Sequence, residues 1–201
     1  MKLVIATTNP HKLDEIRAIL DGSGLELVGL DAWPDLPEPP EDGERFEDNA
    51  AQKARFVHEA TGLPVLADDS GLEVDALGGA PGVRSRRFTP EATAASNNAR
   101  LLHRLDGVDD RRARFRCALA LVSSSGQALA AGACEGRIAL APSGEGGFGY
   151  DPLFLPDEAP GRSMAQLSAQ EKNRISHRGR ALAHLPGMLR ELGLSTPGPE
   201  R

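Results

Sequence analysis

The chain has 201 residues, 40% of them hydrophobic and only 4% aromatic, which suits a single globular domain with a core built mainly from Ala, Leu and Val. Its formal net charge of -6 argues against general binding to nucleic acid, and no apolar run approaches the roughly 20 residues that span a membrane. The first apolar run, residues 3–6, is too short for a signal peptide, and Cys117 and Cys134 lack the spacing of a zinc site, so we expect a reduced, cytoplasmic protein.

The N-terminal half alternates apolar runs with helical patterns. Strands are predicted at residues 2–7, 25–30 and 65–67. One helix is predicted to start at Asn9-Pro10, an N-cap followed by a first-turn proline, and another covers residues 45–61 and ends at Gly62. The proline-rich, acidic segment 31–43 between them is expected to be a surface loop.

The C-terminal half adds a predicted hairpin and further helices. Strands are expected at residues 114–123, 128–140 and 150–155, the first two joined by a hairpin turn. Helices are expected to begin near Thr89, at the capping box Ser168–Glu171, and near Ser176, with Pro186 interrupting the last one. This order predicts an α/β fold, a two-lobed single domain over residues 1–194 with a central mixed sheet flanked by helices, and a disordered tail at 195–201.

The acidic pair Asp68-Asp69 follows a buried run and is predicted to stand at the end of its strand, before Ser70. Successive side chains of a strand point to opposite faces, so the two carboxylates are not expected to share one role. Two carboxylates at this place favour a site that holds a cation, such as Mg²⁺, or a cluster of Lys and Arg partners. The alternative is a simple turn leading into Gly71.

Several basic groups are candidates for binding phosphate. Thr7, Asn9 and Lys12 lie where a strand ends and a helix begins, a place that attracts anions, although an ordinary N-cap with a surface lysine is the alternative. Lys53, Lys172 and His177-Arg178 are candidates to surround a triphosphate and its base, although each alone also fits a surface position. The arginines between Arg100 and Arg116 alternate with aspartates and are expected to form a solvated surface.

Six ordered motifs resemble the inosine triphosphate pyrophosphatase family, enzymes that act on dITP, ITP and XTP. The motifs are Thr7-x-Asn9-x-x-Lys12, Phe46–Ala50 with Lys53, Ala67–Leu72, Leu77–Val83, Gly146–Pro152 and Ser176–Gly179. The glycine-rich segment 144–149 also fits GxGxxG, but Tyr150-Asp151-Pro152 follows where a dinucleotide site needs a helix.

The resemblance implies Mg²⁺-dependent hydrolysis to nucleoside monophosphate and pyrophosphate. Asp69 is expected to accept a proton from water and, with Glu41, to bind Mg²⁺; Glu38, Asp42 and Glu44 are alternatives to Glu41. The implied substrate-binding residues are Thr7, Thr8, Asn9, Pro10, His11, Lys12, Lys53, Ser70, Phe148, Gly149, Tyr150, Asp151, Lys172, His177 and Arg178. Phe148 is expected to stack on the base, and Arg178 to donate to the 6-keto oxygen, because guanidinium has only donors and adenine carries a donor there.

The resemblance also implies a homodimer with a purine nucleoside triphosphate as substrate and neither nucleic acid nor a membrane as partner. Two other functions are compatible with the same residues. One is a related pyrophosphatase that prefers pyrimidine nucleotides, and the other is a nucleotide-binding sensor without turnover.

Overall fold

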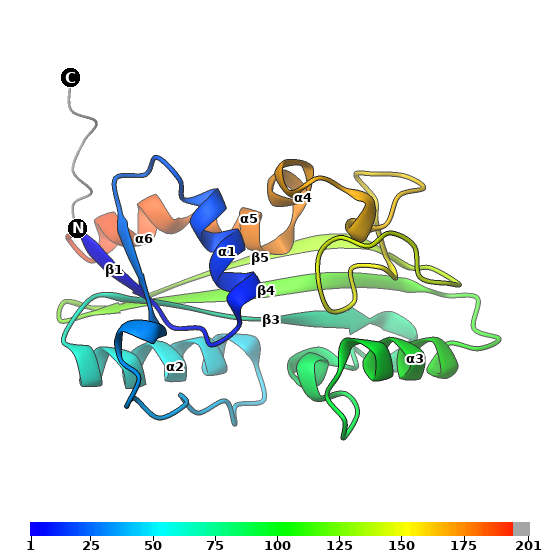
Figure 1. The fold of residues 1–201 in the computed structure, drawn as a ribbon, viewed down its shortest axis with the longest axis horizontal. Coiled ribbons are helices and arrows are strands. Elements are labelled where there is room, and N and C mark those ends of the chain that lie inside the picture. The colour runs from blue at the N-terminus through cyan, green and yellow to red at the C-terminus, as the bar shows by residue number, and fades with distance from the viewer. Residues whose placement is uncertain (195–201) are drawn as a thin grey trace. The chain divides into compact units, whose positions relative to one another are not determined.

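Six strands form a mixed sheet in the computed structural model, which describes residues 1–194 (Figure 1). The predicted tail at 195–201 lies outside the described residues. The strands, in the spatial order β2-β1-β3-β4-β5-β6, are β1 (Lys2–Ile5), β2 (Glu26–Gly29), β3 (Val65–Val74), β4 (Arg112–Ser123), β5 (Gly126–Ile138) and β6 (Phe154–Pro156). β1 pairs in parallel with β2 and β3, whereas β5 and β6 are antiparallel, so the predicted α/β class with a mixed sheet is confirmed.

Six α-helices accompany the sheet in the described part of the chain. They are α1 (Pro10–Ile19), α2 (Phe46–Thr61), α3 (Ala94–Arg104), α4 (Ala169–Ile175), α5 (His177–Leu182) and α6 (Leu185–Glu191). The chain divides into two compact units, one comprising residues 1–69, 117–132 and 178 onward, the other residues 70–116 and 133–177. We call them unit 1 and unit 2 and describe each by itself.

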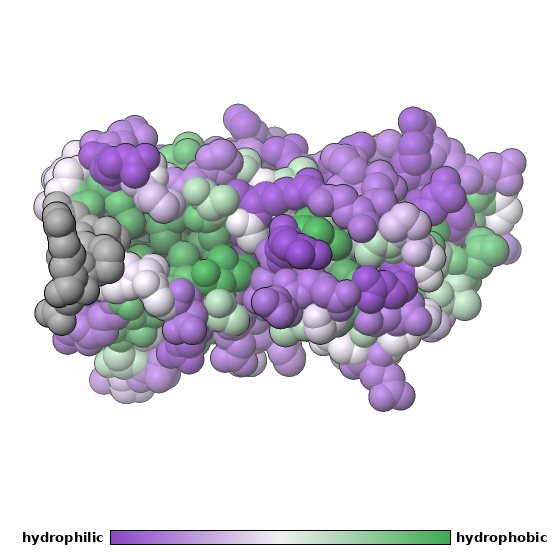
Figure 2. Space-filling model, turned by 90° about the horizontal axis from the view of Figure 1, so that it is seen from above, coloured by the Kyte–Doolittle hydropathy of each residue, from purple (hydrophilic) through white to green (hydrophobic). Residues whose placement is uncertain are grey.

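Unit 1 is built around the apolar strand β1. Leu3, Val4 and Ile5 are almost completely buried, as expected for a strand covered on both faces. Helices α1 and α6 lie on one side of the sheet in this unit and α2 on the other (Figure 1). In the view from above, hydrophobic residues show at the surface on the left, where Figure 1 places α1 and α6, in keeping with the partly buried Leu13 and Leu20 (Figure 2).

Unit 2 has its own core. Leu72 and Val74 from the second half of β3 pack in one buried cluster with Leu101 of α3 and with Leu105, which directly follows this helix. Among the described residues, none of the helices of either unit combines the length and the hydropathy that a membrane span requires.

Local signals predicted several element boundaries correctly. Asn9 caps α1 by accepting a hydrogen bond from the His11 amide, and Ser168 forms the predicted capping box with Glu171 at the start of α4. Gly62 ends α2 in the left-handed conformation, with φ of 68°. The predicted interruption near Pro186 is also confirmed, because separate helices α5 and α6 occupy this region and Pro186 lies in the first turn of α6.

Three predicted boundaries were wrong. β3 does not end at the acidic pair but continues to Val74, because Gly71, Leu72 and Val74 are themselves buried. The helix expected near Thr89 begins only at Ala94, where Thr93 caps it, since Ala92 has a positive φ of 51° that no helix continues.

The third error concerns the segment predicted as extended at residues 150–155. Tyr150 begins a turn, in which the amides of Leu153 and Phe154 donate to its carbonyl, and only Phe154–Pro156 is a strand. The surface loop predicted at 31–43 is largely correct but starts inside a short 3-10 helix, Leu30–Ala32.

Substitution of Gly62 tests the end of α2. A Cβ at this position meets no atom within 4 Å, so Gly62→Ala introduces only the strain of a left-handed alanine. We expect the free energy of unfolding to fall by about 1–2 kcal/mol in urea titrations. Gly62→Asn is the matched variant, and it should lose less, because asparagine tolerates this conformation better. Equal stability of wild type and both variants would contradict this account of the helix end.

Candidate functional site

Asp68 is the centre of a buried ion-pair network in unit 1. Its side chain is fully buried, and Oδ2 accepts hydrogen bonds from Arg178 Nη2 at 2.9 Å and Nε at 3.3 Å. Lys12 Nζ, from α1, lies 3.2 Å from the same oxygen. Arg178 also donates through Nη1 to Glu15. We call Lys12, Glu15, Asp68 and Arg178 the Asp68 network.

The charges of this network explain the ionisation of its central carboxylate. Burial disfavours the charged form of Asp68, but the nearby charges of Lys12 and Arg178 outweigh burial and hold its pKa well below the usual range. Burial also opposes the charge of Arg178, and Asp68 and Glu15 nevertheless raise the pKa of its guanidinium. Asp68 therefore stays ionised, and its negative charge is compensated by Lys12 and Arg178 within the fold.

Asp69 points to the opposite side of β3 and has different partners. Its Oδ2 accepts a hydrogen bond from Asn49 Nδ2 at 2.9 Å, and Lys53 Nζ lies 3.7 Å from Oδ1. Both partners belong to α2. Asn49 is fixed in turn, because its Oδ1 accepts a hydrogen bond of 2.7 Å from the Gly43 amide. Alternation along β3 thus separates the two carboxylates, as the sequence predicts.

Lys53 joins Asp69 to Glu41. The ammonium is buried and lies 2.6 Å from Glu41 Oε1. Burial lowers the pKa of Lys53, but Asp69, Asp68 and Glu41 together raise it. The pKa of Asp69 is raised, because burial has a larger effect on it than the nearby positive charge. Lys53 lowers this pKa only in part, since other carboxylates also interact with the Lys53 ammonium. Asp69 is therefore the carboxylate of the pair that binds a proton more readily.

Asp69 and Glu41 have the chemistry that a magnesium site needs. Both are hard oxygen donors that approach one buried positive charge, and Mg²⁺ in phosphate-binding sites commonly uses one or two carboxylates and takes its other ligands from water and phosphate. Within residues 1–194 no group of three or more His, Cys, Asp and Glu side chains is arranged to hold a metal ion by itself. The donor set fits an ion that is bound together with a substrate.

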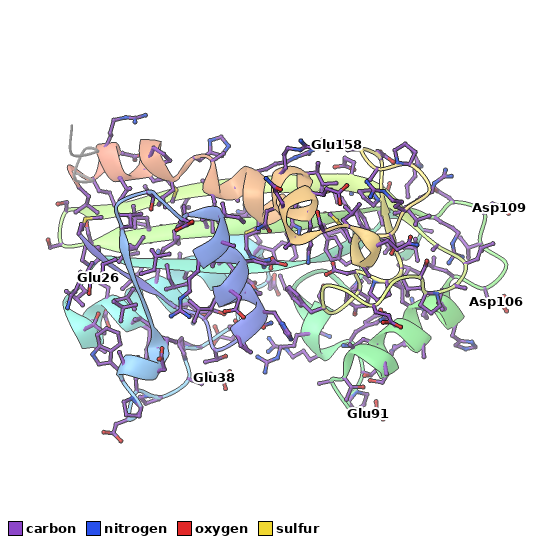
Figure 3. The ribbon with its side chains drawn as sticks, turned by 45° about the horizontal axis from the view of Figure 1, so that its top comes forward. Glu26, Glu38, Glu91, Asp106, Asp109 and Glu158 are labelled. Carbon is purple, nitrogen blue, oxygen red and sulfur yellow. The ribbon has the colours of Figure 1, made fainter. Side chains whose placement is uncertain are left out.

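The other acidic residues of the loop are less suited to this role. Glu38, Asp42 and Glu44 are exposed, and Glu38 points away from the protein (Figure 3). Asp42 accepts a hydrogen bond from Gln52 Nε2 at 2.7 Å. Of these acidic residues, Glu41 is the one that pairs with Lys53, which also lies beside Asp69.

The segment from Thr7 to Lys12 leads into α1 and includes its N-cap, Asn9, and its first residues. Thr7 Oγ1 accepts a hydrogen bond from the Asn9 amide, and Asn9 Oδ1 accepts one from the His11 amide. Thr8, Pro10 and His11 are exposed, whereas the Lys12 side chain is only 14% exposed beside Asp68. Lys12 is therefore more than an ordinary surface lysine.

In unit 2 a second cluster surrounds Phe148. Asp151 Oδ2 accepts hydrogen bonds from Lys172 Nζ at 2.6 Å and from the Phe148 amide at 2.7 Å. The Lys172 ammonium lies 4.8 Å from the centre of the Phe148 ring, within the range of a cation–π interaction. We call residues 147–151 the Phe148 loop.

Tyr150 and His177 occupy structural positions in unit 2. The Tyr150 hydroxyl donates to the Ser85 carbonyl at 2.9 Å, and burial raises the pKa of this phenol. The buried His177 ring stacks on Phe115, with 4.9 Å between ring centres. Ser70, predicted to contact substrate, is the first residue of unit 2 along β3 and is partly buried.

Three residues of these clusters were not predicted from the sequence. Glu15 follows Lys12 by three residues, so their helical spacing was an available signal. Asn49 lies inside the Phe46–Ala50 motif and precedes Lys53 by one helical turn. Asn98 donates from Nδ2 to the Gly149 carbonyl at 3.0 Å, and no local pattern connects these two residues.

The arginines between Arg100 and Arg116 are engaged within unit 2. Arg111 donates to the carbonyls of Leu105, Ile138 and Ala139. Arg112 pairs with Asp110 at 2.7 Å. Asp106 and Asp109, at the surface beside them, point outward (Figure 3). The exposed pair of Arg112 and Asp110 agrees with the expected solvated surface, whereas Arg111 is partly buried and binds backbone carbonyls.

Comparison with known proteins supports the resemblance found in the motifs. The Ham1 family profile matches residues 3–187. The chain is 52% identical over 188 residues to the dITP/XTP pyrophosphatase of Geobacter sulfurreducens, covering 92% of this chain and 94% of the relative. It is 51% identical over 196 residues to the dITP/XTP pyrophosphatase of Mycolicibacterium paratuberculosis, covering 94% and 96%.

Solved structures show the same fold. The Ham1 protein of Staphylococcus aureus superposes with a TM-score of 0.84 at 36% identity, covering 95% of this chain and 99% of that one. A HAM1 protein from Coxiella burnetii gives a TM-score of 0.84 at 40% identity, with the same coverage. The predicted family and fold class are confirmed.

Replacing Asp68 or Asp69 by asparagine should have different effects on the free energy of unfolding. Asp68→Asn leaves Lys12 and Arg178 without their buried partner, and we expect a loss of about 3–5 kcal/mol in the free energy of unfolding at pH 7. Asp69→Asn removes a carboxylate whose pKa is raised by burial, so the variant should be as stable as wild type or more stable. Urea titrations in the presence of EDTA measure both.

The pH dependence provides a check on this prediction. Because the folded-state pKa of Asp68 is lowered, its contribution to stability is present above the unfolded pKa of about 3.9 and is lost as the pH falls further. The difference between wild type and Asp68→Asn should therefore shrink in acid. Equal losses of stability for both variants at pH 7 would contradict the separation of the two roles.

Proposed function

The chain belongs to the Ham1 family, and we propose on that premise that it hydrolyses non-standard purine nucleoside triphosphates, dITP, ITP and XTP, to the monophosphate and pyrophosphate. Such an activity removes these nucleotides from the precursor pool. The observation that carries the proposal is the arrangement of Asp69, Asn49, Lys53 and Glu41: an oriented carboxylate with a raised pKa beside a buried ammonium and a second carboxylate.

Asp69 is proposed to accept the proton of the attacking water. A carboxylate with an ordinary pKa is a weak base at neutral pH, and the raised pKa of Asp69 makes it a better acceptor. The hydrogen bond from Asn49 fixes the orientation of the carboxylate. The water oxygen bonds to the α-phosphorus, the bond from that phosphorus to the bridging oxygen breaks, pyrophosphate leaves, and the abstracted proton passes to Asp69.

Positive charge in unit 1 supports binding of the triphosphate. Lys12 and Lys53 are proposed phosphate ligands, together with the polar groups of Thr7, Thr8, Asn9 and His11 at the start of α1. Asp69 and Glu41 are the residues proposed to hold Mg²⁺. When bound, this ion would neutralise phosphate charge and stabilise pyrophosphate as a leaving group.

In unit 2 the Phe148 loop is proposed to recognise the base. The Phe148 ring would stack on it, with Gly149, Tyr150 and Asp151 shaping the loop, and Lys172 and Ser70 as further substrate contacts. Arg178, which belongs to unit 1, is proposed separately as the donor to the 6-keto oxygen, as the family resemblance implies. Because Asp68 and Glu15 hold its guanidinium, the orientation of this donor is fixed before substrate binds.

Release of pyrophosphate from a panel of nucleotides tests the proposal. With Mg²⁺, we expect kcat/KM for dITP and XTP to exceed that for dGTP, ATP and dTTP by at least about tenfold. Asp69→Asn should lower kcat by about 10²–10⁴-fold while the protein remains folded.

Each competing function predicts a different result. Release of orthophosphate would indicate a phosphatase, and preference for dTTP would indicate a pyrimidine-directed enzyme. Binding of dITP without turnover would indicate a sensor.

We further propose that the protein is a cytoplasmic homodimer. Light scattering of the purified chain tests the oligomeric state.

A further inference from the structure

The Phe148 loop is connected to helix α3 through one side chain. Asn98 Nδ2 donates to the carbonyl of Gly149 at 3.0 Å, so a residue of α3 holds the backbone directly after Phe148. The direction of this bond also fixes the amide, because only its NH₂ end can donate to a carbonyl. Asn98 has no place among the predicted substrate ligands.

The backbone of the loop explains why such a contact matters. Gly147 and Gly149, on either side of Phe148, have φ values of 68° and 62°. Glycines allow this left-handed conformation but also many others, so the loop has a large conformational entropy when nothing holds it. Asp151 holds the loop at the Phe148 amide, and Asn98 holds it at the Gly149 carbonyl.

Asn98 is an unfavourable residue for its helix. Asparagine has a lower helix propensity than alanine or leucine, and position 98 lies in the interior of α3. Its Oδ1 is buried and has no hydrogen-bond partner within residues 1–194. An unsatisfied buried acceptor destabilises a fold, and an apolar residue at this position would avoid that cost. The hydrogen bond to the loop is the compensating interaction that the structure shows.

We propose that Asn98 is a positioning residue for base recognition: it holds the Gly149 carbonyl and thereby fixes the direction in which Phe148 meets the base. This inference rests on the proposed function. Asn98 does not touch the phosphates in this account. Its loss should therefore weaken binding of a nucleotide and leave binding of a phosphate chain without a base unchanged.

Two substitutions separate the hydrogen bond from the shape of the side chain. Asn98→Asp keeps the shape but turns a second acceptor toward the Gly149 carbonyl, and Asn98→Ala removes the contact. We expect KM for dITP to rise by about 3- to 10-fold, with the larger effect for Asn98→Asp, and kcat to stay within about twofold. The inhibition constant of inorganic triphosphate, measured against dITP, should not change.

Thr93→Ala is the matched control on the same helix. Thr93 caps α3 by accepting a hydrogen bond of 3.1 Å from the Ser96 amide, and its side-chain bonds stay within the first turn of the helix. This variant should lower the melting temperature and leave KM for dITP unchanged. Gly147→Ala serves as a positive control, because its methyl group would collide with Asp151 and distort the loop directly.

The outcomes are distinguishable. A rise in KM for dITP with a constant inhibition constant for inorganic triphosphate supports the inference. It is overturned if KM stays unchanged in the folded Asn98 variants, if triphosphate inhibition weakens in parallel, or if Thr93→Ala raises KM equally. Absence of dITP turnover in the wild-type protein refutes the proposed function and this inference together, whereas turnover with an unaffected Asn98→Asp variant refutes the inference alone.

Discussion

Two adjacent carboxylates in the middle of a buried strand are the constraint on which unit 1 depends. A β-strand turns successive side chains to opposite faces, so Asp68 and Asp69 form their ion pairs with different basic residues. Each needs its own positive partner, because an unpaired buried carboxylate is strongly unfavourable. Lys12 and Arg178 form ion pairs with Asp68 on one side of β3, and Lys53 pairs with Asp69 on the other.

This separation gives the two residues different electrostatic characters. The positive charges of Lys12 and Arg178 outweigh the effect of burial on Asp68, so its pKa is lowered and it remains ionised. Asp69 shares Lys53 with Glu41, and burial raises its pKa. The charge of Asp68 is thus compensated by two cations, whereas that of Asp69 is compensated only in part. The proposed role of Asp69 as a proton acceptor depends on this incomplete compensation.

The cluster around the Phe148 loop in unit 2 depends on a different physical effect. In the Phe148 loop the problem is conformational entropy rather than charge, since two glycines flank the aromatic ring. Contacts from Asn98 and Lys172 restrict the loop from outside, and the bond from the Phe148 amide to Asp151 restricts it from within. Positioning of the ring therefore depends on residues that are distant in the chain and not on the loop sequence alone. The same holds for the Arg178 guanidinium, whose direction is set by Asp68 and Glu15.

The sequence by itself determined the features that obey local rules. The apolar run of β1, the Asn9 cap of α1, the Gly62 end of α2 and the capping box of α4 all follow from residues within a few positions of each other. Alternation also predicted that Asp68 and Asp69 would have different roles. The ordered motifs identified the family, because six matches in sequence are specific even when each one is weak.

Only the tertiary structure decided which groups meet. The partners Asp68 and Arg178 are 110 positions apart, and no local pattern pairs them. The continuation of β3 to Val74 was also not predicted, because it depends on burial of Gly71, Leu72 and Val74 beneath elements that lie far away in the sequence. Asn98 and Gly149 meet only when α3 packs beside the loop. Local propensity acts over a few residues, whereas charge compensation and packing act between elements that the fold has already brought together.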